Sequence, residues 1–141
     1  MGVRRYQDLF AWQLAEALKE EIFRLIERNR VKLISWKYRD QIVESSAAVP
    51  KDIAEGFVRY SPAQFKTFLD YALASLAESE LWLKDGVFRK YFSPEEAQEG
   101  LTLAKRCWKA TLGLKHSQER ELRRRRRQRR RPGPRPPDPP T

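Results

Sequence analysis

The segment Gln41–Arg59 places a proline in the middle of an apolar helical pattern. Its larger apolar side chains recur at helical spacing and define one face: Ile42, Val49, Ile53 and Phe57. Pro50 lacks the N–H that a helix interior needs and clashes with the preceding turn, at a cost of about 3 kcal/mol. We therefore predict a helix that is kinked at Pro50 and supported by tertiary packing. The alternative is a helix that ends at Val49 and restarts after the proline.

Three further segments repeat apolar side chains at helical spacing. The first follows Asp8, which we expect to be its N-cap, and the other two open at Ser61-Pro62 and Ser93-Pro94. In both of these, serine is suited to cap the helix and proline to occupy its first position. Together with a helix over about 36–60, these segments predict an all-α, up-and-down four-helix bundle in residues 1–116. No segment alternates for long enough to be a strand.

The net charge of +10 is concentrated near the C-terminus. From Ser117 onward, ten arginines face Glu119, Glu121 and Asp138, which leaves +7, whereas the preceding 116 residues carry 19 basic and 16 acidic side chains, or +3. Repulsion among the clustered arginines argues against a stable helix without a bound anion, beyond a short continuation of the last helical segment. Residues 132–141 are proline-rich and favour an extended chain. We therefore predict that residues 117–141 form a disordered, basic, proline-rich tail.

A body of mixed charge with a basic appendage indicates a polyanionic partner. Guanidinium groups bind phosphates in a bidentate manner and stack on bases, and arginine-rich segments fold onto RNA. We therefore predict nucleic-acid binding, with RNA as the expected partner, through eight clustered arginines: Arg123, Arg124, Arg125, Arg126, Arg127, Arg129, Arg130 and Arg131. Basic side chains of the folded body form the alternative binding surface: Arg4, Arg5, Lys105, Arg106 and Lys109.

The proline-bearing segment also carries a sequence motif. The run VPKDIAEGF over residues 49–57, followed by Arg59, resembles the signature S-I-P-x-N-I-A-E-G-F-x-R of the four-helix-bundle proteins encoded in 23S rRNA intervening sequences. Asp52 stands where that family usually has asparagine, Ala48 where it has serine, and Val43-Glu44 where it often has arginines. The resemblance extends over residues 6–115 and implies a structural role for the motif residues: Pro50, Asp52, Ile53, Ala54, Glu55, Gly56 and Arg59.

The same resemblance implies an assembly. Members of the family form homopentameric barrels, and the accessory variability determinant of diversity-generating retroelements is a structural relative of the family. We therefore expect a homo-oligomer, with the pentamer as the state that the resemblance implies. A further version of the function, from the same resemblance, is an accessory subunit of a retroelement reverse transcriptase. The wide apolar faces of the first and third helical segments favour self-association.

Four tryptophans fall one in each expected helix. Trp12 and Trp108 are in phase with the apolar stripes, so we predict packing roles for both. Trp36 and Trp82 fit the stripes less well, so the pattern leaves two alternatives for them, an interface or an exposed surface.

The sequence offers no catalytic, metal or cofactor site, and we predict that the protein is not an enzyme. Asp52 and Glu55 are three residues apart, but no nucleophile, base or glycine-rich loop accompanies them. We expect His116, the only histidine, at the surface, and Cys107 in the core, where a single cysteine excludes an internal disulfide. No apolar run is long enough to span a membrane and no signal-peptide pattern opens the chain, so we expect a cytoplasmic protein.

These observations favour a non-enzymatic, oligomeric RNA-binding bundle protein. The alternative is a protein-interaction scaffold whose basic tail gives only non-specific binding of polyanions. Salt-dependent RNA binding separates the two, because each phosphate contact releases counterions.

Overall fold

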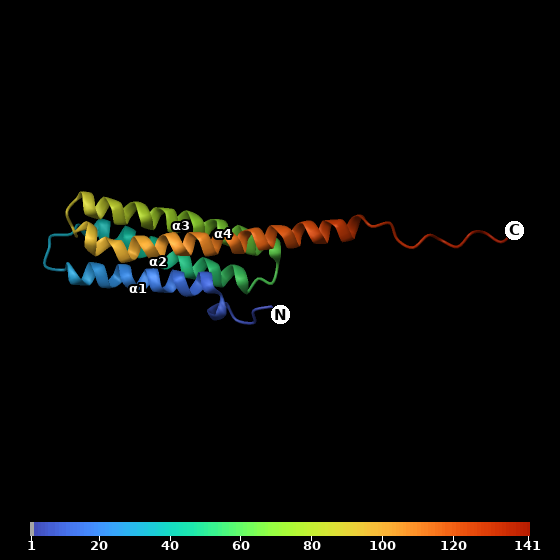
Figure 1. Ribbon diagram of the computed structural model, residues 1–141, viewed down its shortest axis with the longest axis horizontal. Coiled ribbons are helices and arrows are strands. Elements are labelled where there is room, and N and C mark those ends of the chain that lie inside the picture. The colour runs from blue at the N-terminus through green and yellow to red at the C-terminus, as the bar shows by residue number, and fades with distance from the viewer. Residues whose placement is uncertain (1) are drawn as a thin grey trace.

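The computed structural model describes residues 2–141 and contains four long helices that lie side by side (Figure 1). A 3-10 helix, η1 (Tyr6–Asp8), precedes them, and the α-helices are α1 (Phe10–Arg28), α2 (Trp36–Phe57), α3 (Pro62–Phe88) and α4 (Pro94–Arg130). Helices α1 and α3 each pack against both α2 and α4. The connections reverse the chain each time, so the fold is the predicted up-and-down four-helix bundle. The described residues include no strand.

The core lies between the four helices and consists mainly of aliphatic side chains. Leucine and isoleucine residues from three helices are fully buried along the bundle: Leu18, Ile22, Leu25, Ile42, Ile53, Leu69, Leu76 and Leu83. Helix α4 contributes smaller side chains, among them Ala104 and Cys107. Burial of each large aliphatic side chain contributes about 1.5–3 kcal/mol, which makes this cluster the main source of stability.

Helix α2 continues through Pro50 without interruption. Pro50 and its neighbours Val49 and Ile53 are buried, so the proline lies inside the core-facing part of the helix. Because Pro50 has no N–H, the carbonyl of Ser46 loses its usual partner one turn later, and tertiary packing must offset that loss. The alternative in which the helix ends at Val49 and restarts is therefore wrong.

Small residues allow α2 and α3 to approach closely on either side of the proline. A β-carbon added at Gly56 would lie 2.7 Å from Cβ of Phe68 and 2.8 Å from Cδ1 of Phe65. Toward the other end of the contact, Ser79 Oγ of α3 donates a hydrogen bond to Ser45 Oγ of α2 at 3.1 Å. Only glycine fits the first position without moving a phenylalanine ring or the α3 backbone.

The predicted helix starts at Ser61 and Ser93 are confirmed. At Ser93, the Glu96 N–H donates to Ser93 Oγ and the Ser93 N–H donates to Glu96 Oε1, each at 3.1 Å, which completes a capping box. Ser61 Oγ accepts a hydrogen bond from the Gln64 N–H at 3.3 Å. Proline follows each serine at the start of the helix, as expected.

The predicted N-cap at Asp8 is wrong. Asp8 lies in η1, and Leu9 is the N-cap of α1 without a side-chain hydrogen bond. The cause is the tight turn before α1, in which the Asp8 N–H donates to the Arg5 carbonyl and the Leu9 N–H to the Tyr6 carbonyl. Asp8 instead forms an exposed ion pair with Arg5 at 3.7 Å.

The tryptophans follow the prediction only in part. Trp12 is half-buried and packs edge-on against Tyr6, and Trp36 is 73% exposed. Trp82 packs edge-on against buried Tyr38 and belongs to the periphery of the core. Trp108 is 40% exposed, so its predicted core role is wrong. Cys107 holds the inward position, and one further residue rotates the next side chain by about 100° around the helix.

The predicted disorder of residues 117–141 is corrected for residues 117–130, which continue α4 as helix. The carboxylate of Glu121 accepts hydrogen bonds from Arg124 Nη2 at 2.6 Å and from Arg125 Nε at 3.0 Å. These ion pairs, three and four residues apart, offset part of the arginine repulsion, and arginine itself favours helix. Residues 132–141 have no regular secondary structure, in line with their proline content.

We expect Gly56→Ala to lower the free energy of unfolding by about 1–3 kcal/mol, because its β-carbon overlaps Phe65 and Phe68. Gly56→Leu should be far more damaging. Gly113 is the matched control, since it also lies within a helix but a β-carbon there meets nothing within 4 Å. Gly113→Ala should raise stability by up to about 1 kcal/mol. Chemical unfolding followed by circular dichroism measures all three, and wild-type stability for Gly56→Leu would contradict the close packing.

Candidate nucleic-acid interface

One exposed face of α4 carries basic side chains from the bundle to the helix end. The spacings along this face are 4, 11, 3 and 4 residues, each close to a whole number of helical turns. All five side chains are exposed, and we call them the basic stripe: Lys105, Lys109, Arg120, Arg123 and Arg127. The structure therefore brings residues predicted separately in the body and in the tail onto one face of α4, in two groups that are eleven residues apart.

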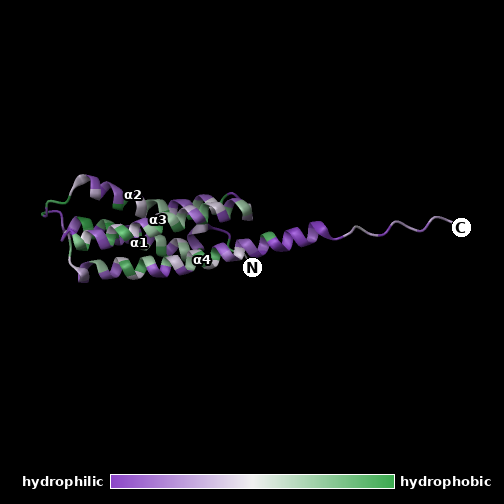
Figure 2. Cartoon of the chain, turned by 90° about the horizontal axis from the view of Figure 1, so that it is seen from above, coloured by the Kyte–Doolittle hydropathy of each residue, from purple (hydrophilic) through white to green (hydrophobic). Residues whose placement is uncertain are grey.

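The C-terminal part of α4 projects beyond the other three helices. We call residues 117–130 the α4 extension; its first turns still lie beside α3, and its end reaches past the other helices in Figure 1 and is hydrophilic in Figure 2. Five consecutive arginines at 123–127 cover more than one full turn, so guanidinium groups point outward all around the rod. Arg129 and Arg130 continue the extension, and Arg131 is its C-cap.

Glu121 sorts the five consecutive arginines at 123–127 into two groups. Hydrogen bonds from Arg124 and Arg125 lower the pKa of Glu121 to about 2, so its carboxylate stays charged and holds both guanidinium groups. Within residues 2–141, Arg123, Arg126 and Arg127 form no ion pair. The second group is therefore available to an external anion.

Trp108 adds an aromatic side chain beside the basic stripe. It lines a cleft of about 760 Å³ between α3 and α4, together with Leu101, Lys105 and Arg106. An exposed tryptophan next to cations is the arrangement on which single-stranded bases stack. Sequence reasoning assigned Trp108 to packing, although the run Lys105 to Lys109 interleaves this tryptophan with basic residues.

The other predicted basic residues are not members of the stripe. The guanidinium of Arg106 turns toward α1 and lies 5.9 Å from the ring centroid of Phe10. Arg4 and Arg5 are exposed in the N-terminal segment, at the same end of the bundle as the α4 extension (Figures 1 and 2). Arg5 pairs with Asp8. These residues add positive charge near the basic stripe but are not part of it.

The motif around Gly56 is a packing element. Pro50, Ile53 and Gly56 are buried, and the Arg59 guanidinium lies 5.2 Å from the ring centroid of Phe68. Ala54, Asp52 and Glu55 are half-buried. Partial burial raises the pKa of Asp52, and Lys51 opposes this effect. The motif contacts α3 and contributes no side chain to the basic stripe.

Other sequence-predicted features also have clear positions. Cys107 is fully buried, as predicted, and burial raises the pKa of its thiol to about 11. His116 is exposed, as expected. Among residues 2–141, no group of three or more potential metal-ligating side chains comes together. None of the helices described here is long and apolar enough to cross a membrane.

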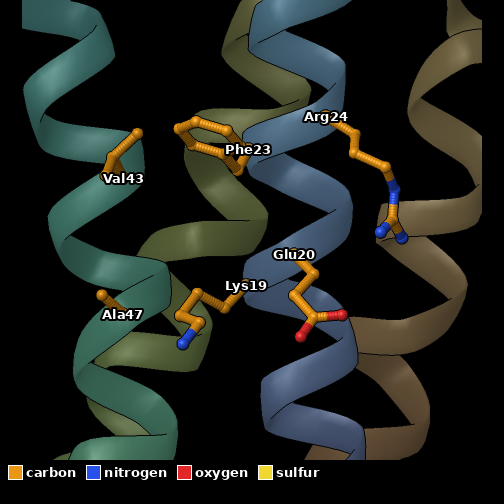
Figure 3. Close-up of a pocket in the computed structure, with 6 residues that line it drawn as sticks. All are labelled: Lys19, Glu20, Phe23, Arg24, Val43 and Ala47. Atoms are coloured by element: carbon orange, nitrogen blue, oxygen red, sulfur yellow. The ribbon is translucent and has the colours of Figure 1, made fainter.

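An apolar groove lies on the opposite part of the bundle, between α1 and α2. It encloses about 360 Å³ and is lined by Lys19, Glu20, Phe23, Arg24, Val43 and Ala47. Figure 3 shows Phe23 of α1 and Val43 of α2 pointing toward one another across this groove. Phe23 is 58% exposed, so the groove adds apolar area to the surface of an isolated chain.

The sequence and the fold are similar to those of known proteins. The family described as 23S rRNA-intervening sequence protein matches residues 7–113. A crystal structure of a protein of unknown function from the S23 ribosomal protein family of Bacteroides thetaiotaomicron has the same fold, with a TM-score of 0.65 and 18% identity over 74% of this chain and 96% of that chain. A comparison with curated proteins finds no significant match. Because the family match spans more than half of the chain and includes the motif around Gly56, the protein belongs to the 23S rRNA-intervening sequence protein family.

Proposed function

We propose that this protein is a non-enzymatic RNA-binding bundle protein that binds its partner along α4. The observation that carries this proposal is the basic stripe, whose two groups, Lys105 with Lys109 and Arg120 with Arg123 and Arg127, lie on the same face of one uninterrupted helix. From Lys105 to Arg130 the helix is roughly 38 Å long, enough to follow several successive phosphates of a strand. Guanidinium groups bind these phosphates, and Trp108 offers a ring for an unpaired base.

The preference for RNA over other polyanions rests on the pairing of an arginine-rich helix with an exposed aromatic side chain. A further version of this function is an accessory subunit of a retroelement reverse transcriptase, as in the accessory variability determinant. In that version, α4 binds the template RNA while the bundle contacts the enzyme. A reduced, buried Cys107 is compatible with action in the cytoplasm. The competing function is a protein-interaction scaffold with weak, non-specific polyanion binding.

We also propose that the protein acts as a homo-oligomer, with five-fold symmetry as the expected state. Large apolar side chains are exposed over α1 and at the end of the bundle far from the α4 extension: Phe10, Phe23, Leu33, Trp36, Leu81 and Phe88. An apolar surface rimmed by polar side chains marks a site of protein–protein contact, and exposed Phe23 with its groove, bordered by Lys19, Glu20 and Arg24, is such a surface. The groove beside Phe23 is a ready position for a neighbouring copy.

Truncation after Ser117 tests the RNA interface. Each phosphate neutralised on a single strand contributes about 0.7 to the slope of log affinity against log salt. If five or six arginines engage, the truncated protein should lose a slope of roughly 4 and most of its RNA affinity at moderate salt. Truncation after Arg131 is the control, because it removes only residues 132–141 with Arg135. Equal affinity and slope before and after truncation at Ser117 would contradict the proposal.

Light scattering coupled to size exclusion tests the oligomer. The wild type should elute as several chains per particle, and Phe23→Glu should reduce that mass because it places a charge in the apolar groove. Ala63→Glu is the control, since it adds the same charge at an exposed position near the start of α3. A monomer mass for the wild type at micromolar concentration would rule the assembly out.

A further inference from the structure

We propose that the junction between α3 and the α4 extension is a binding cleft for a single phosphate group of the RNA backbone. The cleft encloses about 210 Å³, and we call it the junction cleft: Lys66, Glu119, Leu122, Arg123 and Arg126. The inference rests on the proposed RNA-binding function and names the place where one phosphate is held. It also adds Lys66, a residue of α3, to an interface otherwise formed by α4.

Two helices supply the cations of the junction cleft. Lys66 lies near the start of α3 and is half-buried, whereas Arg123 and Arg126 are exposed and lie one turn apart on α4. Leu122 is half-buried beside them, so the α4 extension still packs against α3 at this level. Packing at Leu122 thus fixes where the two arginines stand relative to the lysine.

The charges of the junction cleft are not satisfied inside the chain. Within residues 2–141, Lys66, Arg123 and Arg126 form no ion pair, although neighbouring cations do. Arg124 and Arg125 bind Glu121, and Lys115 binds Asp70 at 2.7 Å. Three cations therefore converge on one cleft.

Glu119 is the one carboxylate in the junction cleft, which leaves a net charge of +2 from three cations and one anion. Its charge also acts on Lys115, whose pKa is raised first by the hydrogen bond to Asp70 and further by Glu119. The remaining positive charge favours an anion, and repulsion among the three cations falls when one binds.

The chemistry of the cleft fits a phosphodiester. An arginine binds two phosphate oxygens in a bidentate manner, and a lysine supplies a compact point charge. The exposed arginines farther along the rod accept a phosphate in any register. A phosphate held from two helices instead fixes the position of the strand along α4, because contacts to phosphates set register and orientation.

Lys66→Gln is the sharpest test, because Lys66 lies outside the arginine cluster. We measure binding of full-length protein to a short single-stranded RNA of random sequence over a range of salt. We expect Lys66→Gln to weaken binding roughly threefold to tenfold at moderate salt and to lower the salt slope by about 0.7. Lys51→Gln, an exposed position on α2, is the control and should match wild type. Circular dichroism checks that both variants keep their helix content.

A pair of double variants separates the cleft from total charge. Arg123→Gln/Arg126→Gln should weaken RNA binding more than Arg124→Gln/Arg125→Gln, although both remove two charges from the same helix turn. The combined variant Lys66→Gln/Arg123→Gln should lose less RNA affinity than the product of the two single-variant fold-losses, because both side chains bind one phosphate.

Three outcomes would contradict the proposed phosphate site in the junction cleft. The first is equal RNA affinity for Lys66→Gln and Lys51→Gln while truncation after Ser117 still abolishes binding; the proposed function then survives without the cleft. The second is equal loss in the two double variants. The third is a Lys66→Gln defect seen with anionic phospholipid vesicles but not with RNA. The proposed function itself would be contradicted by a different result, namely RNA binding that stays at the wild-type level after truncation at Ser117.

Discussion

The contact between α2 and α3 at Gly56 sets the position of the elements around it. With no side chain at Gly56, Phe65 and Phe68 of α3 lie directly against the α2 backbone, and the close packing offsets the hydrogen bond that Pro50 removes. Phe65 and Lys66 are adjacent in sequence, so the residue that anchors α3 on α2 also sets where Lys66 meets α4. The packing motif and the proposed phosphate cleft thus share one helix turn of α3.

Which arginines can bind an external anion depends on the positions of the neighbouring carboxylates more than on the number of arginines. Glu121 holds Arg124 and Arg125, and this local network lets a helix persist through a run that repulsion alone would open. The same pairing leaves Arg123, Arg126 and Arg127 without a carboxylate partner in residues 2–141, so they can bind an external anion. A preformed helical rod binds a strand at a smaller cost in conformational entropy than a disordered tail, because less of the chain must be ordered on binding.

Local sequence signals predicted the fold well, and longer-range effects explain the differences. The helix starts at Ser61 and Ser93 follow from side chains three residues apart, so the sequence alone predicts them. The prediction of an N-cap at Asp8 was wrong because a backbone turn takes the place of the side-chain cap. The prediction of a core position for Trp108 was wrong because a shift of one residue along a helix is enough to move a side chain from the core to the surface. Lys66 has no sequence signal at all. Its role depends on α3 and α4 lying side by side, which only the tertiary structure reveals.

The central claim is that α4 carries its basic face out of the bundle as one continuous helix. Pulsed electron paramagnetic resonance tests it directly, with spin labels on Lys105→Cys and Arg127→Cys in a Cys107→Ala background, diluted with unlabelled protein. Twenty-two residues of helix span roughly 33 Å, so the structure predicts a narrow distance distribution near that value in the absence of RNA. A broad distribution that narrows only when RNA is added would show that the extension is disordered in the free protein and would contradict this account.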